Sequence, residues 1–563
     1  MLKKNLSYGL IILLFVVFVF FFIPNDKQYK VEKVLSPIEF IVNGKSFILN
    51  NLSCLDSNYT ENNKNIAKQL SISEDEAFIL GNLGKDWAEN AILNRKVSIT
   101  TNDIIYYKVS YKTKFMFSGF CFKDSKPYSK YLFEQRLNSI RRGKYVVLDT
   151  NTEKVYNVGD IETKKLKNFL VLRKNYIPKN KPIKSYSYKQ NKISQSPPLE
   201  FISGNIKVFV SDETTKIKPD RNCDTFMCKE ILNNINNSSQ TIDMAVYGYS
   251  KVPKIENAIT SAVKRGVKVR LVCDSDSKGG NIYNDTFVLK KLITNNSDDK
   301  KSVEANSIMH NKFYIFDGKI VITGSTNLSH TDMSGFNTNI MVSLNSPKAA
   351  QIYRQEFEQM YNGKYHNDKA KTINNAISDK IKVYFSPQDK GIQNAILPLI
   401  NNAKNYIYIP TFVLTEKRVT NSLIQARNRG VDIKIIMDAL NASMRHTKHK
   451  ELRQNGILVK TENYAGKMHA KTMIIDDRYV VIGSMNFSNS GENKNDENML
   501  VIENPEIAKY LKQFFNYQWN KIDNKWLKYN ARAEGKDSIG SCNDGLDNNY
   551  DGYTDADDSA CKG

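Results

Sequence analysis

A histidine, a lysine and an aspartate stand at fixed spacing in one short stretch of this chain, and together they suit phosphate chemistry. The stretch runs from His310 through Lys312 to Asp317 and ends in Gly-Ser-Thr-Asn at 324–327. An imidazole can attack phosphorus or move a proton, an ammonium can hold phosphoryl oxygens, and small residues let backbone donors approach a ligand closely. The stretch therefore predicts a binding site for a phosphate ester.

A second stretch repeats the first at every fixed position. It runs from His469 through Lys471 to Asp476 and ends in Gly-Ser-Met-Asn at 483–486, although the whole chain has only six histidines. Two such cassettes, as we call these stretches, would supply two imidazoles and two ammoniums around one tetrahedral phosphate. The alternative is that each histidine is a hydrogen-bonded core residue and each lysine a solvated strand end. That alternative explains one copy better than it explains two.

The residues around the first cassette predict the strands that position it. Mainly apolar residues surround His310 and fill the stretch as far as Asp317, which is the pattern of a buried strand. Side chains two apart on a strand point to the same face, so the imidazole and the ammonium of Lys312 are expected side by side. A turn at Asp317 and Gly318 should lead into a second strand over 319–323.

The flanks of the cassettes repeat as well. The segment 206–211 parallels 381–386, and 262–269 parallels 426–433, where a helix ends in glycine just before an apolar strand. Each half thus reads strand, helix, strand, helix, strand and then cassette. We expect an internal duplication of an α/β unit, with two cores packed across one active site.

Written as H-x-K-x4-D-x6-G-S-x-N, the two cassettes make the chain resemble the phospholipase D superfamily over about residues 203 to 530. The resemblance implies two α/β/α sandwich halves, at 203–368 and 378–530. It also implies a two-step phosphodiester displacement that needs no metal cofactor. His310 would attack phosphorus, while His469 would act first as an acid and then as a base. Both halves lie in one chain, so no obligate dimer is expected.

The same resemblance assigns the remaining candidate residues. The lysines and asparagines would hold phosphoryl oxygens, whereas the two aspartates would orient strand and turn. The catalytic set is completed by Lys312, Asp317, Lys471, Asp476 and Glu497. The phosphate-binding set is Ser325, Asn327, Ser484 and Asn486.

One position departs from the family's pattern. An acidic residue usually follows G-S-x-N by a few positions and, in several members, supports the histidine of the opposite half. Glu497 fills this place in the second half, but Asn339 occupies it in the first. A carboxylate fixes the imidazole tautomer and stabilises its cation, whereas an amide does only the former. If the pairing crosses the halves, Glu497 serves His310 and Asn339 serves His469, which favours His310 as the nucleophile.

The N-terminus carries an apolar run. Residues 8–23 are uninterrupted by charge, follow Lys3 and Lys4, and end at Pro24. At ~1.5 Å per residue the run is short for a membrane span but usable, and a cleaved signal peptide is the alternative, although no small-x-small site follows. We expect an uncleaved signal-anchor at 1–25 that holds the catalytic part outside the cytoplasm, at the cell surface or in the periplasm.

The C-terminus, residues 537–563, is rich in aspartate and bracketed by Cys542 and Cys561. Closely spaced carboxylates around glycine turns suit a hard cation, so a Ca²⁺ site is expected. It resembles the short Cys-bracketed calcium-binding modules of secreted proteins, and a disordered acidic tail is the alternative. The candidate ligands are Asp544, Asp547, Asp551, Asp555 and Asp557.

The other cysteines leave their connectivity open. Cys223 and Cys228 can pair, as can Cys54 and Cys121, which leaves Cys273 on an expected buried strand. None of the spacings is that of a zinc site.

Two further regions precede the catalytic halves. Residues 28–174 contain strand-like runs and a helical stretch at 74–93, and we expect a small α+β accessory domain. Its opening has a faint resemblance to nuclease barrels of the staphylococcal type, without a matching set of catalytic residues. Residues 175–200 are rich in lysine, serine and proline and predict a flexible basic linker.

The cassettes indicate the bond but not the molecule that carries it. A formal net charge of +22 draws the chain to polyanions, whether lipid headgroups or nucleic acid. The leading interpretation is a phospholipase D-type hydrolase of membrane phospholipids. The alternatives are a membrane-tethered endonuclease and a phosphatidyl transferase of the cardiolipin-synthase kind. A catalytically silent scaffold is disfavoured because both histidines and both lysines of the cassettes are intact.

Overall fold

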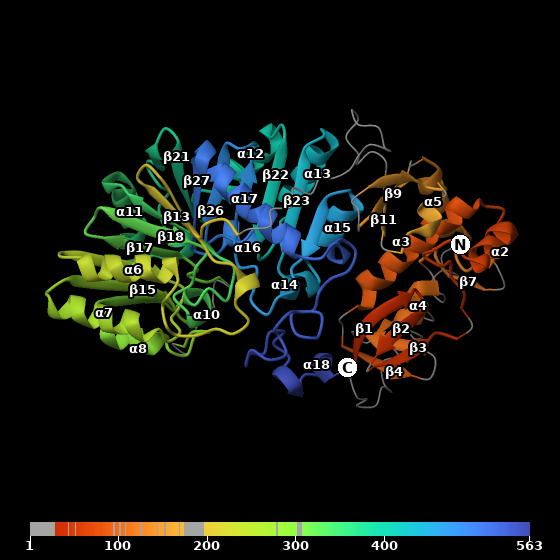
Figure 1. Cartoon of the computed structure of the whole chain (residues 1–563), viewed down its shortest axis with the longest axis horizontal. Coiled ribbons are helices and arrows are strands. Elements are labelled where there is room, and N and C mark those ends of the chain that lie inside the picture. Colours follow the sequence, from red (N-terminus) through yellow and green to blue (C-terminus); the bar gives the residue numbers. More distant parts are fainter. Residues whose placement is uncertain are drawn as a thin grey trace, which may run out of the picture. The chain divides into compact units, whose positions relative to one another are not determined.

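The chain forms two compact units in this computed structural model, Met1–Lys144 and Tyr145–Gly563 (Figure 1). The structure describes residues 29–562 except 43, 51, 94–95, 101–102, 107–108, 117, 124–125, 143–144, 151–153, 161, 168, 174–195, 277–279 and 301–306. The expected anchor at 1–25 and most of the expected linker at 175–200 therefore lie outside the described residues.

The first unit is a small α+β structure. Its main sheet has the strand order β3-β2-β1-β4-β5-β6, and every described pairing in it is antiparallel. Its strands are β1 Tyr29–Ser36, β2 Glu39–Val42, β3 Lys45–Ile48, β4 Lys96–Thr100, β5 Asp103–Tyr106 and β6 Val109–Ser110, with a short hairpin of β7 Phe122–Lys123 and β8 Lys126–Pro127. Its helices are α2 Glu61–Leu70, α3 Glu74–Ile92, α4 Tyr111–Met116 and α5 Lys130–Arg142.

Helix α3 matches the helical stretch that the sequence predicts. Ser73 accepts a hydrogen bond from the backbone of Glu76, and the Glu76 side chain accepts one from the backbone of Ser73, which forms a capping box. A three-stranded sheet follows the helical part, with β9 Tyr145–Asp149 between β10 Val155–Asn157 and β11 Phe169–Arg173. The unit boundary groups this sheet with the second unit, whereas the sequence interpretation grouped it with the accessory domain.

The first of the two repeated halves is built on an eight-stranded sheet of order β12-β13-β19-β18-β17-β14-β15-β16. Strands β14, β15 and β16 are mutually parallel, and β17 runs antiparallel to β14. The strands are β12 Glu200–Ser203, β13 Ile206–Val210, β14 Thr241–Val246, β15 Lys268–Asp274, β16 Asn296–Asp299, β17 Lys312–Phe316, β18 Ile320–Gly324 and β19 Ile340–Asn345.

The second half repeats this sheet strand for strand, in the order β20-β21-β27-β26-β25-β22-β23-β24. The repeat confirms the duplicated α/β architecture that the sequence predicts. The strands are β20 Ala376–Ser378, β21 Ile381–Ser386, β22 Tyr406–Thr411, β23 Asp432–Met437, β24 Leu458–Thr461, β25 Met473–Ile475, β26 Tyr479–Gly483 and β27 Glu497–Glu503.

Helices cover both sheets, and three apolar cores result. The central core joins the inner faces of the two sheets through α11 Pro347–Tyr361 and α17 Pro505–Lys521. One outer core packs α6, α7 and α8 on the first sheet, and the other packs α12, α13 and α15 on the second (Figure 1). These helices are α6 Phe226–Asn237, α7 Pro253–Lys264, α8 Thr286–Leu292, α12 Leu397–Asn402, α13 Lys417–Asn428 and α15 His449–Gln454.

The expected glycine stops end α7 and α13. Gly266 has φ +85° and Gly430 has φ +98°, a left-handed conformation that glycine adopts without strain. In each half the chain then enters the strand parallel to the previous one, β15 or β23. This is the local geometry that makes helix-glycine-strand a repeating unit of both halves.

Strand direction places each cassette at the carboxyl end of the parallel strands of its sheet. Because β17 runs antiparallel to β14, the start of β17 lies at the carboxyl end of β14, and β25 and β22 repeat this relation. His310 lies just before the start of β17, and His469 lies just before the start of β25. The loops that leave the carboxyl ends of β14, β15, β22 and β23 surround the same edge.

The expectation of a membrane-anchored protein with an extracytoplasmic catalytic part requires correction. Within the part of the chain that the structure describes, no helix has both the length and the apolar character needed to cross a bilayer. The run at 8–23, on which that expectation was based, lies outside the described residues. The structure thus gives the expectation no support.

Candidate active site

The backbone of each cassette pairs with the opposite half. The amide of His310 donates to the carbonyl of Asp496 at 2.9 Å, and the amide of His469 donates to the carbonyl of Thr338 at 2.9 Å. Asp496 and Thr338 each precede the residue that the sequence singled out as a partner of the opposite histidine. The duplication therefore places each imidazole directly beside a segment from the other half.

The side chains on these segments hold the imidazoles. The Nδ1 atom of His310 lies 2.8 Å from Oε2 and 2.9 Å from Oε1 of Glu497, and Nδ1 of His469 lies 2.9 Å from Oδ1 of Asn339. The crossed pairing expected from the sequence is thus present. Since Nδ1 is occupied in both rings, Nε2 is the nitrogen left for chemistry.

The two cassette serines support these partners. Ser484 donates its hydroxyl proton to Glu497 at 2.7 Å, and Ser325 donates its own to Asn339 Oδ1 at 2.7 Å. Both serines are buried and each also accepts a backbone amide of its own half. Both hydroxyls thus hydrogen-bond the partners of the imidazoles, and their expected contact with phosphate stays a prediction.

The lysines lie behind the histidines on the same side of the strand. Nζ of Lys312 donates to the carbonyl of His310 at 2.8 Å, and Nζ of Lys471 donates to the carbonyl of His469. Burial lowers the pKa of Lys312 to about 8 and holds the pKa of Lys471 well below its ordinary value. An anion bound between the cassettes would restore the full charge of both ammoniums.

Two aromatic residues that the sequence analysis missed complete the site. The ring of Tyr247 packs edge-on against His310 with centroids 5.1 Å apart, and Phe412 packs in the same way against His469 at 4.9 Å. Lys312 and Lys471 also approach these two rings, at 5.4 Å and 4.7 Å. Each aromatic residue directly follows the first parallel strand of its half, β14 or β22. Their equivalent positions in the two halves were the sequence signal that could have identified them as site residues.

Burial favours the neutral form of both imidazoles. It lowers the pKa of His310 to about 4 against the opposing charge of Glu497. Together with the nearby charges of Lys471, Lys312 and His310, it also lowers the pKa of His469 well below its ordinary value. A neutral imidazole with a free Nε2 has the lone pair that an attack on phosphorus requires.

The cassette aspartates fasten turns rather than touch the centre. The carboxylate of Asp317 accepts the backbone amides of Ser239, Gln240 and Thr241 at 2.8–2.9 Å. Asp476 accepts those of residues 404–406 at 2.7–2.8 Å in the same way. Each aspartate thereby ties its hairpin to the start of the neighbouring strand.

Replacing Asp317 by asparagine should therefore lower stability rather than chemistry. Loss of a charged acceptor for three amides is expected to lower the free energy of unfolding by about 1–3 kcal/mol, with kcat per folded molecule nearly unchanged. Although burial opposes the shift, the three amide donors lower the pKa of Asp317, so its contribution is present above the unfolded pKa and is lost on acidification. Urea unfolding of the variant beside the exposed-turn control Asp379→Asn checks this. A large kcat loss at unchanged stability would contradict it.

In the part of the chain that the structure describes, the two cassette asparagines have side-chain oxygens without a partner. Asn327 is buried and Asn486 half-buried, and Oδ1 of each lacks a hydrogen-bond partner among the described residues. The backbone amide of Asn327 is fixed by the carboxylate of Asp332 at 2.6 Å. An amide oxygen accepts hydrogen bonds, so contact with phosphoryl oxygens would come from the Nδ2 groups, and that contact stays a prediction.

A buried ionic cluster that the sequence did not indicate lies directly behind Glu497. Nε2 of His366 lies 2.6 Å from Asp299 and Nδ1 lies 3.0 Å from Asp496, which also pairs with Lys369 at 2.7 Å. Although burial opposes a charged ring, the two carboxylates raise the pKa of His366 to about 9. Because each ring nitrogen faces its own carboxylate, the cluster is an ion network that fixes the backbone next to Glu497.

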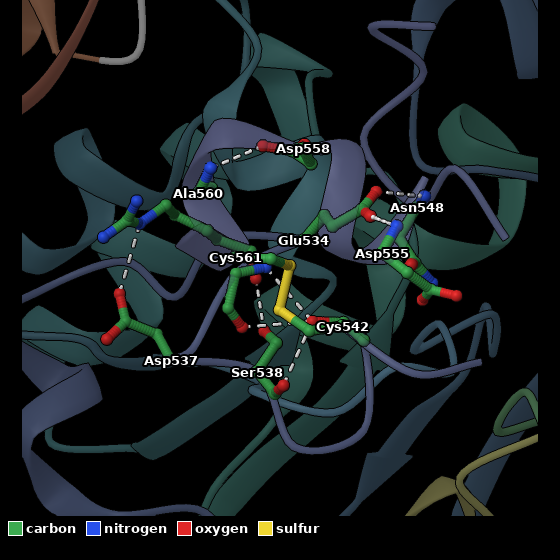
Figure 2. The surroundings of a disulfide bond; sticks show 12 residues. Glu534, Asp537, Ser538, Cys542, Asn548, Asp555, Asp558, Ala560 and Cys561 are labelled. Atoms are coloured by element: carbon green, nitrogen blue, oxygen red, sulfur yellow. Dashed lines mark hydrogen bonds and ion pairs between the residues drawn. A yellow bond between two sulfur atoms is a disulfide. The ribbon is translucent and has the colours of Figure 1, made fainter. Parts of the chain in front are cut away.

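The C-terminal segment is closed by a disulfide between Cys542 and Cys561, with Cα atoms 5.6 Å apart (Figure 2). The buried carboxylate of Glu534 accepts the backbone amides of Asn548 and Asp555 at 2.9 Å and 2.6 Å inside this loop. A second disulfide joins Cys223 and Cys228, as the sequence allowed, whereas Cys54, Cys121 and Cys273 are buried thiols.

The calcium site expected in this segment is not supported. Across the described ranges, the one group of His, Cys, Asp or Glu side chains whose ligand atoms converge is Asp299, His366 and Asp496. In the tail, Asp555 accepts the amides of residues 544 and 545, and Asp547 accepts those of 551 and 552. The carboxylates are thus used to close the loop's own turns.

This segment also contacts the second cassette. Tyr550 hydrogen-bonds Nζ of Lys467, whose ammonium lies 4.4 Å from the centre of the tyrosine ring. The pKa of Tyr247 is raised first by burial and also by Asp274 and Tyr550. Residues 534–563 carry eight acidic and two basic side chains, so the segment that contacts Lys467 has a net negative charge.

Comparison with known proteins agrees with this geometry. The family model described as cardiolipin synthase, PLD-like domain matches residues 231–361 and 396–519. A phospholipase D from Rickettsia felis is 32% identical over 145 residues, which are 26% of this chain and 72% of the relative. A mitochondrial cardiolipin hydrolase from Chlamydomonas reinhardtii is 29% identical over 22% of this chain and 56% of its own. Among solved structures, Nuc from Salmonella typhimurium, a phospholipase D family member, is 29% identical over 27% of this chain and 97% of its own, with a TM-score of 0.24.

Each of the two α/β halves brings one histidine and one buried lysine to a shared centre. This arrangement is typical of a phosphodiesterase. The matching family model and the Rickettsia relatives make the assignment specific: the chain belongs to the phospholipase D superfamily. It is a hydrolase of phosphodiester bonds.

Proposed function

We propose that this protein hydrolyses phospholipid phosphodiesters through a phosphohistidine intermediate on His310. The observation that carries the chemistry is the crossed pairing, in which Glu497 holds Nδ1 of His310 at 2.8 Å and leaves Nε2 for attack. The developing positive charge on the attacking ring is then stabilised by the Glu497 carboxylate.

Two steps complete the turnover. Nε2 of His310 forms a bond to phosphorus, the bond to the leaving alcohol breaks, and His469 gives its proton to the departing oxygen. His469 then takes a proton from water, the water oxygen attacks phosphorus, and the phosphorus–nitrogen bond breaks. Lys312 and Lys471 hold the equatorial oxygens as charge develops. The steps use only groups of this chain and no metal ion.

The substrate class is supported by two observations. Relatives of which the chain covers two thirds or more are named phospholipase D. In addition, the acidic segment 534–563 contacts Lys467 beside the second cassette, and its charge repels an extended polyanion from that side of the site. A phospholipid, which presents a single phosphodiester, meets less of this repulsion than a nucleic acid strand does.

A nuclease activity is the second candidate, because the net charge of +22 favours association with nucleic acid. Transfer of a phosphatidyl group to an alcohol, as the description of the family model suggests, differs only in which acceptor replaces water.

The substrate is tested with the full chain on two substrates in parallel, in the presence of a chelator. Labelled phosphatidylcholine vesicles should release headgroup and leave phosphatidate, while single-stranded DNA of equal phosphate concentration should be cut more slowly. The His310→Ala variant should do neither. Cleavage of DNA alone would overturn the lipid assignment, and loss of all cleavage on adding the chelator would overturn the metal-free mechanism.

A further inference from the structure

The two catalytic imidazoles have chemically different partners. Glu497 places a carboxylate on Nδ1 of His310, whereas Asn339 places a neutral amide on Nδ1 of His469. An amide oxygen fixes which tautomer His469 adopts, but it adds no negative charge to stabilise the ring when Nε2 is protonated. An acid that works at this position needs that charge from elsewhere.

A carboxylate that the sequence analysis did not single out lies next to His469. Asp332 belongs to the short helix α10 His330–Met333 and is 1% exposed. Its Oδ2 atom lies 3.7 Å from Nδ1 of His469, behind the hydrogen bond to Asn339. This is ion-pair distance once the ring carries a second proton.

The orientation of Asp332 is fixed by neutral donors. Oδ2 accepts the backbone amide of Asn327 at 2.6 Å, and Oδ1 accepts the side-chain amide of Asn337 at 2.6 Å. Ser329 caps the helix by accepting the amide of Asp332 at 3.3 Å. The carboxylate is held in place without a positive partner in these contacts, so its charge is available to the ring.

Among the residues that the structure describes, the second half places no carboxylate in this role. Helix α16 Asn489–Asn493 is its counterpart of α10, and its buried acid, Glu492, accepts the amide of Gln393 at 2.7 Å and pairs with Arg418. Its charge is therefore neutralised away from the centre. Each imidazole therefore has one carboxylate from the opposite half. Glu497 hydrogen-bonds His310 directly, whereas Asp332 lies beyond hydrogen-bond distance of His469.

We propose that Asp332 is a positioning residue that supplies His469 with the negative charge that Asn339 lacks, and so makes His469 the proton donor of the reaction. The inference rests on the acid–base role proposed for His469. When the leaving oxygen takes the proton from Nε2, the ring becomes neutral, and when water gives a proton back, the imidazolium forms again beside Asp332.

The charges around His469 show why such a carboxylate matters. Burial lowers the pKa of His469, and Lys471, Lys312, His310 and Lys467 lower it further. The Asp332 carboxylate acts in the opposite direction on this centre, because it raises the pKa values of both Lys312 and Lys471. A bound phosphate monoanion adds to its effect and brings the imidazolium into reach at neutral pH.

The test is the variant Asp332→Asn, assayed on a phosphodiester with an alkyl leaving group and on a nitrophenyl ester that leaves without a proton. The limb of the kcat/KM profile that reports protonated His469 should move to lower pH by about one unit or more. kcat on the alkyl ester should fall about 10- to 100-fold, with a smaller loss in nitrophenol release. The limb that reports His310 should not move.

Rescue separates charge from mere structure. In Asp332→Asn/Asn339→Asp the carboxylate returns to Nδ1 of His469 on an isosteric side chain, so the pH limb and the alkyl-ester rate should recover. If Asp332→Asn does not fold, Asn339→Asp alone should move the same limb to higher pH. An unshifted limb in these variants, or a double variant as slow as the single one, would overturn the inference. A wild-type enzyme that cleaves only nucleic acid would instead overturn the lipid assignment, and the same profiles would then be measured on that substrate.

Discussion

Replacing His310 by alanine is expected to lower kcat for phosphodiester hydrolysis by about 10⁴-fold or more. The reason is that the variant loses the nitrogen that forms the covalent bond, while Glu497 is left buried without its ring. The measurement is steady-state hydrolysis of vesicle phospholipid. The control His446→Ala changes a histidine that is exposed on a loop, and it should retain full activity.

His469→Ala should behave differently from His310→Ala on a substrate with a nitrophenyl leaving group. The first step then needs no proton donor, so one equivalent of nitrophenol should appear in a burst before turnover stalls. His310→Ala should show no burst. A burst from His310→Ala and none from His469→Ala would exchange the two roles and contradict the proposed mechanism.

Glu497→Gln is the change with the second-largest expected effect, a fall in kcat of roughly 10²- to 10³-fold. The glutamine keeps the hydrogen bond at Nδ1 of His310 but removes the charge that stabilises the ring as it bonds to phosphorus. Because Glu497 opposes the burial that lowers the pKa of His310 to about 4, its loss lowers that pKa further. The acidic limb of the kcat/KM profile should therefore move to lower pH. The measurement is kcat/KM as a function of pH for the variant and the wild-type protein.

A matched control exists on the same strand. Glu503 lies at the far end of β27 and pairs with Arg478 at 2.8 Å, so Glu503→Gln makes the same change outside the site. It should leave kcat and both limbs unchanged. An equal loss of activity in the two variants would indicate that the strand tolerates no such change, and Glu497 would lose its assigned role.

The cassettes were predictable from sequence because their geometry is local. Strand periodicity sets Lys312 two residues from His310, and a turn sets Asp317 at the end of the same strand. The crossed pairing of Glu497 was also within reach, since a duplicated fold places equivalent segments opposite each other. This prediction depended on the family resemblance, because spacing alone does not reveal which half supplies the partner of each histidine.

The direction of short side chains was not predictable. Ser325 and Ser484 follow glycine in a phosphate-binding pattern, yet their hydroxyls donate to Asn339 and Glu497. A hydroxyl rotates toward the strongest buried acceptor, and that acceptor is known only once the strands β18 and β19, or β26 and β27, are paired.

Clusters formed by residues from distant segments were not predictable from the sequence for a related reason. Asp299, His366 and Asp496 converge although nearly two hundred positions separate the first from the last. Tyr247 and Phe412 follow apolar strands and have the character of core residues in any one-dimensional pattern.

The aspartates of the C-terminal segment misled the sequence analysis because carboxylates that bind Ca²⁺ and carboxylates that close turns occur at similar spacing. Asp547 and Asp555 accept backbone amides of their own loop. Their partners depend on the disulfide-closed conformation, which the sequence does not specify.

The central claim is that His310 is the residue that becomes phosphorylated. The most direct measurement is rapid acid-free quenching of the full chain during turnover of a ³²P-labelled nitrophenyl phosphodiester, whose leaving group needs no proton, followed by digestion and mass-spectrometric mapping of the labelled peptide. The proposed mechanism predicts the label on the peptide that contains His310, with more of it in His469→Ala than in the wild-type protein. Label on His469, or hydrolysis with no labelled histidine at all, would contradict it.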